Sequence, residues 1–246
     1  MTVNRNPRKM TYLSVNINKI ALLRNARGSN LPDLIQVAKD IESFGAQGIT
    51  IHPRPDQRHI RYDDVPALRA VVSTEFNIEG KPSRTFLDLV MANAPHQCTL
   101  VPDTESQLTS DHGWDTVRQQ SELREVVQEL QKNGIRTSVF VDPDPRMVEG
   151  AKLAGADRVE FYTGPFAHSF DKNPLAAVQP YTKAAQVANE IGIGINAGHD
   201  LNLHNLRYFK EHCPHLLEVS IGHALIADAL YYGLENTVKM YLRQLR

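Results

Sequence analysis

The 246-residue sequence contains only two cysteines and one tryptophan, and no Gly/Ser-rich or Pro-rich linker divides it. Cys98 and Cys213 are too few for a disulfide framework and lack the spacing of metal ligands, so we expect reduced thiols. No apolar run reaches the roughly 18–20 residues of a membrane span, and the first residues lack the apolar core of a signal peptide. These absences predict a cytoplasmic protein with no membrane partner.

Neither sign of charge predominates, because the formal net charge is −1. This balance argues against nucleic acid as a partner. A hydrophobic content of 41% with 22% charged residues predicts a globular chain with a sizeable core. The first 32 residues nevertheless hold six basic residues and no acidic one. We expect residues 1–246 to form one domain, with residues 1–10 as a flexible tail.

Short apolar segments rich in β-branched residues alternate with amphipathic segments along the whole chain. The predicted strands are Tyr12–Asn18, Gly48–His52, Phe76–Glu79, Gln97–Val101, Arg136–Asp142, Arg158–Tyr162, Gly194–Asn196 and Leu217–Ile221. Helical patterns include Leu31–Phe44, Ser83–Asn93, Ser121–Asn133, Pro145–Leu153 and Leu175–Glu190. Glycine follows four helical segments just before a strand, as is usual where a helix ends.

Eight strand–helix units in this length predict an α/β fold, a (β/α)8 TIM barrel. A doubly wound sheet is less consistent with the sequence, because no G-x-G-x-x-G motif follows the first strand. The loops after strands two, four and six are long, so we expect extra helices or lids there. The loop of residues 102–120 is the candidate lid.

Polar side chains follow the predicted strands where they end, and barrel enzymes place their catalytic groups at those carboxyl ends. The set comprises Asn16, Asn18, His52, Glu79, Asp142, Glu160, His199 and His223. Glu79 and Glu160 end strongly apolar strands, where burial of a carboxylate is costly unless it is paired or lies in a cavity. The opposite ends begin with Gly48, Gln97 and Arg136, and we expect no comparable set of acids and imidazoles there.

Three segments are candidates for binding anions. The first contains Lys19, Arg24 and Arg27, and the second contains Arg54, Arg58, His59 and Arg61. The third comprises the loops 196–200 and 220–224 after strands seven and eight, where barrels often bind phosphate through backbone N–H groups. Three such segments on one face predict substrates that carry more than one phosphate.

Neither a metal nor a Schiff base is favoured by the residues at the strand ends. The sequence has no Cys-x-x-Cys or His-Glu-x-x-His motif, so we expect no catalytic metal. Lys19 is the only lysine near a strand end, and the neighbouring arginines favour a phosphate contact over a Schiff base.

Several motifs, in order from about Tyr12 to the carboxyl terminus, resemble the pyridoxine 5′-phosphate synthase family of deoxyxylulose-5-phosphate-dependent vitamin B6 biosynthesis. They are Val15-Asn-Ile-Asn-Lys-Ile-Ala-Leu-Leu-Arg-Asn-Ala-Arg-Gly28, Ile49-Thr-Ile-His-Pro-Arg-Pro-Asp-Gln-Arg-His-Ile60, Asn77-Ile-Glu79, Leu100-Val-Pro102, Val159-Glu-Phe-Tyr-Thr-Gly164, Asn196-Ala-Gly-His199 and Ile221-Gly-His-Ala224. The resemblance implies a (β/α)8 barrel with extra helices, a homo-octamer and no cofactor. It implies a ring-closing transferase that condenses 3-amino-2-oxopropyl phosphate with 1-deoxy-D-xylulose 5-phosphate into pyridoxine 5′-phosphate, phosphate and water.

The resemblance also implies the roles of individual residues. His52 and Glu79 would accept protons, His199 would donate one, and Glu160 would stabilise a transition state. The residues implied for the amino-ketone phosphate are Asn16, Arg27, Asp200, Gly222 and His223. Those implied for the deoxyxylulose phosphate are Asn18, Lys19, Arg54, His59 and Thr109.

The chain departs from the family pattern at Asn18 and Lys19, where Asp-His is common, and at Asp200, where glycine is common. Asn18 cannot act as a base, and Asp200 adds a negative charge beside a phosphate loop. The alternatives are another phosphate-binding barrel enzyme, such as an isomerase or a Schiff-base aldolase using Lys19, and a catalytically silent barrel that serves as a binding subunit.

Overall fold

The computed structural model describes residues 10–103 and 110–246, and its strands form one closed barrel. Each strand pairs in parallel with the next, and β8 returns to pair with β1. The strands are β1 (Tyr12–Asn16), β2 (Gly48–Ile51), β3 (Glu75–Gly80), β4 (Gln97–Leu100), β5 (Arg136–Val141), β6 (Arg158–Phe161), β7 (Gly194–Ala197) and β8 (Leu216–Ile221). The predicted (β/α)8 barrel is therefore confirmed.

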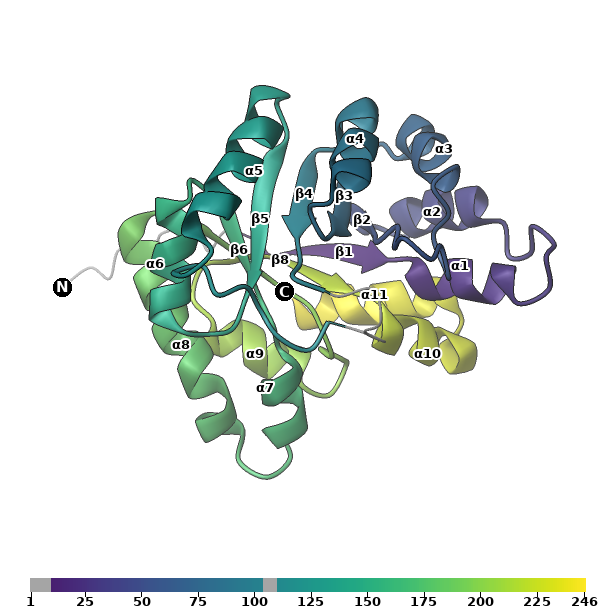
Figure 1. The fold of residues 1–246 in the computed structure, drawn as a ribbon. Coiled ribbons are helices and arrows are strands. Elements are labelled where there is room, and N and C mark those ends of the chain that lie inside the picture. The colour runs from purple at the N-terminus through teal and green to yellow at the C-terminus, as the bar shows by residue number, and fades with distance from the viewer. Residues whose placement is uncertain (1–9, 104–109) are drawn as a thin grey trace.

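Helices surround the strands, and α10 and α11 at the end of the chain pack beside α1 and α2 at its start (Figure 1). The helices are α1 (Asn18–Asn25), α2 (Leu34–Ser43), α3 (Asp64–Val71), α4 (Arg84–Asn93), α5 (Gln120–Lys132), α6 (Pro145–Leu153), α7 (Gly164–Ser169), α8 (Pro174–Ile191), α9 (Leu206–His212), α10 (His223–Tyr232) and α11 (Leu234–Gln244). None of these helices is long and apolar enough to cross a membrane.

The predicted element boundaries agree with the structure to within a few residues. The glycines predicted to end helices, Gly45, Gly134, Gly155 and Gly192, all have positive φ, the left-handed conformation that glycine adopts without strain. An extra helix, α7, occupies the loop after β6 as predicted. A further helix, α1, was not predicted: the first strand ends at Asn16, two residues early, and Asn18 already begins α1.

Alternation along the strands separates an apolar outer face from a polar inner face. Outward side chains such as Val15, Ile49 and Ile78 belong to the apolar core beneath the helices. Inward side chains hydrogen-bond across the barrel: Ser14 Oγ lies 2.7 Å from Thr50 Oγ1, and Asn77 contacts both Thr50 and Thr99. Barrels of this fold usually fill the interior with branched apolar residues, so a hydrogen-bonded polar interior distinguishes this one.

One expectation about the amino ends of the strands is wrong, because charged side chains gather there too. Glu75 accepts a hydrogen bond from Arg136, and Arg158 lies 3.9 Å from Glu75 and 3.5 Å from Glu218. This set was missed because Glu218 lies within an apolar strand, as its third residue. Strand alternation nevertheless turns its side chain into the barrel interior. Glu218 is almost fully buried, and burial together with the charge of Glu75 raises its pKa to about 8, although the charge of Arg158 acts in the opposite direction.

Candidate active site

Three glutamates lie in the barrel interior: Glu79 on β3, Glu160 on β6 and Glu218 on β8. Glu160 and Glu218 are almost fully buried, and Glu79 is half-buried. Burial, together with the negative charges of Asp103 and Glu218, raises the pKa of Glu79 to about 8. Burial and the charge of Glu79 also raise the pKa of Glu160 well above its ordinary value. Like charges this close disfavour simultaneous ionisation, so at neutral pH the interior retains protons that it can exchange.

Hydrogen bonds connect Glu79 to the ends of two neighbouring strands. Asn16 Nδ2 donates to Glu79 Oε2 at 3.3 Å, and Asn16 Oδ1 accepts from the backbone N–H of Asn18 at 3.0 Å. Asn18 Oδ1 in turn accepts from the backbone N–H of His52 at 2.9 Å. The structure therefore brings together Asn16, Asn18, His52 and Glu79, which lie far apart in the sequence.

His52 and His59 lie side by side after β2, with ring centroids 6.2 Å apart. Burial lowers the pKa of His52 well below its usual value, and the nearby positive charges of Arg54 and Arg58 act in the same direction. Burial together with the charges of Lys19, Arg54 and Arg58 lowers the pKa of His59 to about 4. Both imidazoles are therefore neutral near pH 7, the state in which a histidine can accept a proton.

The neutral tautomer of His59 follows from its backbone contact. His59 Nδ1 accepts a hydrogen bond from the N–H of Ile60 at 2.9 Å, so the proton of the neutral ring is on Nε2. Lys19, in the first turn of α1, is near enough for its charge to act on this ring.

Arg54 lies in a buried ion pair rather than in an open cationic loop. Arg54 Nη1 donates to Asp103 Oδ2 at 3.0 Å, and both side chains are at most 5% exposed. Ser110 Oγ donates to the same oxygen at 2.9 Å. Asp103 thereby joins the end of β2 to the loop after β4 and reduces the positive charge of this region.

The first basic segment also carries less unpaired charge than its residue count suggests. The guanidinium of Arg24 is buried and makes two hydrogen bonds to Asp64 of α3, at 2.6 and 2.8 Å. The expectation that Arg24 contributes charge to a phosphate site is therefore wrong, because Arg24 joins α1 to α3. Arg27 lies beyond the end of α1 and is exposed.

The loops after β7 and β8 pack tightly against each other. A Cβ on Gly198 would lie 2.0 Å from the carbonyl oxygen of Ser220, so only glycine fits at this position. Next to it, His199 Nδ1 lies 3.0 Å from Asp200 Oδ2. The structure therefore places the Asp200 carboxylate against His199.

Gly222 and His223 lie where β8 passes into α10. Gly222 immediately precedes this ten-residue helix and packs against the side chain of Asn16. The backbone N–H groups at the start of the helix are suited to an anion. Gly222, His223 and Asn16 therefore form a continuous part of the mouth.

Thr109 and part of the candidate lid lie outside the described residues, since 104–109 interrupt the loop 102–120. Most of the proposed tail, residues 1–9, also lies outside them. Within the described ranges, no cluster of three or more histidine, cysteine, aspartate or glutamate side chains is placed to hold a metal ion. The absence of a catalytic metal stays a prediction.

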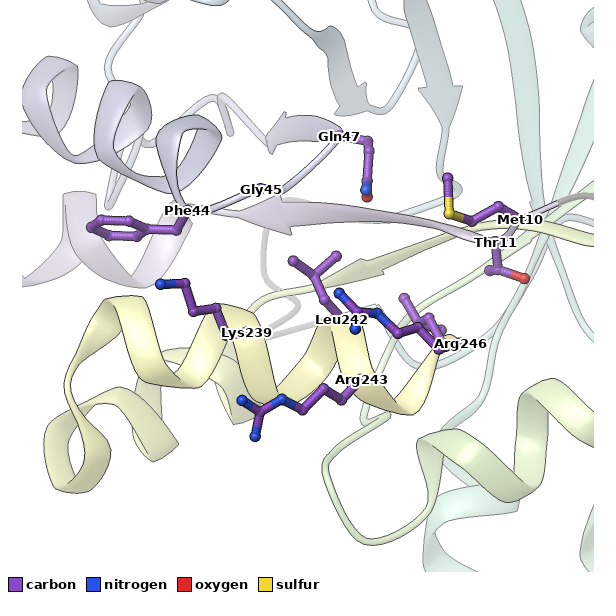
Figure 2. A pocket seen from close by; sticks show the side chains of 10 residues that line it. Met10, Thr11, Phe44, Gly45, Gln47, Lys239, Leu242, Arg243 and Arg246 are labelled. Carbon is purple, nitrogen blue, oxygen red and sulfur yellow. The ribbon is translucent and has the colours of Figure 1, made fainter.

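A cavity of about 390 Å³ lies beside the start of β1 (Figure 2). This is the end of the barrel opposite to the strand ends that carry the candidate site residues. Its lining comes from the start of β1, the turn between α2 and β2, and helix α11; the residues are Met10, Thr11, Phe44, Gly45, Gln47, Lys239, Leu242, Arg243, Leu245 and Arg246. None of the predicted site residues lines this cavity, and the glutamates and histidines of the mouth are absent from it.

Sequence patterns missed two acids that shape the site, Asp103 and Glu218. Asp103 follows the fourth predicted strand by two residues, so its position near a strand end was a usable signal. Glu218 was detectable only from strand alternation, which places its side chain inside the barrel.

The closed barrel, with carboxyl and imidazole groups at the carboxyl ends of its strands, defines a (β/α)8-barrel enzyme of the acid–base type. Residues 13–246 match the family described as Pyridoxal phosphate biosynthesis protein PdxJ. The chain belongs to this family and is an enzyme of pyridoxine biosynthesis.

Relatives of high identity carry one common name. The chain is 62% identical to the Pyridoxine 5′-phosphate synthase of Flavobacterium johnsoniae and 60% identical to that of Christiangramia forsetii. In both cases the match covers 96% of this chain and 100% of the relative.

Solved structures of low identity share the fold. Thiamine phosphate pyrophosphorylase from Pyrococcus furiosus has a TM-score of 0.62 at 12% identity, covering 97% of this chain and 96% of its own. The YdjI aldolase from Escherichia coli has a TM-score of 0.63 at 10% identity, covering 96% and 89%. These likenesses support the barrel and carry no information about its substrate.

Proposed function

We propose that the mouth formed by the carboxyl ends of the strands is where this chain catalyses pyridoxine 5′-phosphate synthesis. The chain is a pyridoxine 5′-phosphate synthase. Its substrates are 3-amino-2-oxopropyl phosphate and 1-deoxy-D-xylulose 5-phosphate, and the products are pyridoxine 5′-phosphate, phosphate and water. Amine addition, loss of water, ring closure and aromatisation all require proton transfers, which suit a set of acids and imidazoles.

One observation carries the assignment of the site: Glu79, whose pKa is raised, is linked by hydrogen bonds through Asn16 and Asn18 to the backbone of His52, whose pKa is lowered. Glu79 has a pKa of about 8, and His52 is neutral at physiological pH. Groups poised on either side of neutrality exchange protons readily with a substrate. His52 and the ionised form of Glu79 act as proton acceptors, and His199 acts as a donor.

Glu160 stabilises the positive charge that develops on an iminium intermediate. Its carboxyl lies at the buried end of the mouth, and its ionisation is coupled to that of Glu79. Uptake of a proton by Glu79 removes a charge that raises the pKa of Glu160, and so favours the ionised form of Glu160 that stabilises the iminium.

The phosphate groups bind at the rim of the mouth. The amino-ketone phosphate meets Asn16, Gly222 and His223 at the start of α10, with Arg27 and the backbone of Asp200. The deoxyxylulose phosphate meets Asn18, Lys19, His59 and Arg54, with Thr109. Lys19 and the Nε2–H of His59 supply donors on one side of the mouth.

The chain assembles into an octamer, and apolar surface on two contacting helices supports self-association. Leu230, Tyr231 and Tyr232 at the end of α10 are 51–86% exposed, and Leu22 and Leu23 on α1 are exposed as well. Such surface on neighbouring helices is typical of subunit interfaces. We place the enzyme in the cytoplasm, where its two buried thiols stay reduced.

The activity test combines the purified chain with both phosphorylated substrates and follows pyridoxine phosphate by absorbance, with and without a chelator. We expect product in both cases. Loss of activity with the chelator would contradict metal-free catalysis. A folded protein that binds neither substrate and forms no product would end the synthase assignment.

A Glu79→Gln variant tests the site itself. The change is nearly isosteric and removes only the ability to take up a proton, so we expect kcat to fall at least 100-fold with an unchanged circular dichroism spectrum. Glu125→Gln, an exposed change on α5, is the matched control and should keep wild-type rates. Wild-type turnover by the Glu79 variant would remove this residue from the mechanism.

A further inference from the structure

His199 has a carboxylate partner that is its neighbour in sequence. Asp200 Oδ2 lies 3.0 Å from His199 Nδ1, and the two side chains are 44% and 24% exposed. The contact holds the pKa of Asp200 below its ordinary value, so this carboxyl is ionised at neutral pH. Adjacent side chains in an extended strand point to opposite faces, so an unusual backbone must allow this contact.

That backbone is a tight turn with Asp200 in a left-handed conformation. The N–H of Leu201 donates to the carbonyl of Gly198 at 3.0 Å, and Asp200, the third residue of the turn, has φ of +65°. Glycine or asparagine is the usual residue at such a position, because a side chain there is strained. An aspartate therefore sits where glycine would be more stable.

The surroundings of the turn hold it in this form. Gly198 is pressed against Ser220, and the carbonyl of Asp200 accepts from Asn202 Nδ2 and Asn205 Nδ2, both at 3.4 Å. The carbonyl of His199 accepts a hydrogen bond from Thr163. The turn is therefore fixed independently of the Asp200 carboxylate.

Groups from other elements face the same pair. The ring of Tyr162, at the end of β6, meets the His199 ring edge-on with centroids 5.4 Å apart. His168 of α7 and His223 of α10 are near enough for their charges to lower the pKa of Asp200. Asp200 is therefore in contact with His199 and within electrostatic reach of two further imidazoles.

We propose that Asp200 is a positioning residue: its carboxylate, 3.0 Å from Nδ1 of His199, orients the ring. This inference rests on the proposed function, in which His199 donates a proton. With Nδ1 facing the Asp200 carboxylate, the proton given to substrate leaves from Nε2, and His199 becomes a neutral ring that is still oriented. In this role the Asp200 carboxylate acts through His199.

Two variants separate positioning from a role in the turn. Asp200→Asn keeps a residue that tolerates the left-handed conformation, and Asp200→Gly relieves the strain of the turn. We expect kcat to fall about tenfold in both, with KM within about twofold, because the contact is partly exposed and contributes less than a buried one. We expect the glycine variant to melt at a higher temperature than the wild type even as it loses activity.

The readout independent of activity is the ¹⁵N spectrum of histidine-labelled protein, with the His199 signals assigned from a His199→Gln variant. The wild type should show a protonated Nδ1 at His199, and both Asp200 variants should show a mixture of tautomers. Asp171→Asn is the matched control, since Asp171 pairs with His204 at 2.8 Å on the exposed surface, and it should leave kcat and the His199 signals unchanged.

The failures are distinguishable. If His199→Gln is inactive while both Asp200 variants retain wild-type kcat and an unchanged His199 tautomer, the positioning role is wrong and the proposed function stands. If His199→Gln itself turns over at the wild-type rate, the role of His199 as donor and the inference are both overturned.

Discussion

At the scale of single residues, burial changes the chemistry of ordinary side chains. Glu79 and His52 would titrate near pH 4.5 and pH 6.5 in water. In the barrel, burial favours the neutral form of each, so the pKa of the acid rises and that of the base falls. Enclosure at the mouth therefore turns an ordinary carboxylic acid and an ordinary imidazole into reactive groups.

The raised pKa of Glu79 predicts how stability depends on pH. The folded state holds this proton up to about pH 8, whereas the unfolded state releases it near pH 4.5. The contribution of the protonated Glu79 to the free energy of unfolding is therefore complete below pH 4.5. It is lost as pH rises to about 8. Between pH 5 and pH 8.5 the wild type should lose more free energy of unfolding than Glu79→Gln, by on the order of 2 kcal/mol.

Urea titrations at several pH values measure this difference. Glu125→Gln, an exposed control, should follow the wild type across the range. Parallel curves for the wild type and Glu79→Gln would show that the carboxyl has an ordinary pKa in the folded protein.

At the scale of elements, α1 is the part of the fold that sequence reasoning described least well. Its residues were assigned to the end of a strand followed by a basic segment, but Asn18–Asn25 form a helix. Arg24 fixes that helix to α3 through Asp64 and also donates to the carbonyl of His59. The helix thereby positions Lys19 and Asn18 at the mouth.

Removal of Asp64 should uncouple α1 from α3. Asp64→Asn leaves the guanidinium of Arg24 buried without a compensating charge, so we expect a loss of about 3 kcal/mol in the free energy of unfolding. Chemical denaturation measures it. Asp88→Asn removes the exposed pair with Arg84 and should cost less than about 1 kcal/mol. Equal effects in the two variants would show that the Arg24 pair has no special role.

At the scale of the whole molecule, the closed barrel separates two kinds of polar cluster. The carboxyl ends carry the proposed site, and the amino ends carry Glu75, Arg136, Arg158 and Glu218. Glu218 links the two, because its charge raises the pKa of Glu79 at the other end of the interior. The polar interior is therefore electrostatically continuous.

The assembly of the whole molecule is also testable. Light scattering after size exclusion should give eight times the 27.6 kDa of one chain. Tyr231→Lys on α10 should lower that mass, whereas Leu153→Lys on α6, also at an exposed apolar position, should not. A monomeric wild type would contradict the octamer.

Much of the fold was predictable because periodicity and glycine positions are local properties. Helix-ending glycines such as Gly192 and the alternation of apolar segments were enough to predict eight strands. The polar groups at strand ends were predictable as well, since parallel strands in a barrel share one mouth. Pairing partners were not: Asp64 for Arg24 and Asp103 for Arg54 are 40 and 49 residues away.

The sequence by itself determined the barrel, the order of its strands and the residue types that meet at its mouth, because these follow from local patterns and one closed topology. Only the tertiary structure decided which charges are neutralised, which carboxyl groups keep their protons, and that Asp200 turns back onto His199. The physical reason is that burial and electrostatic interaction depend on distances in space, whereas the sequence specifies only distances along the chain.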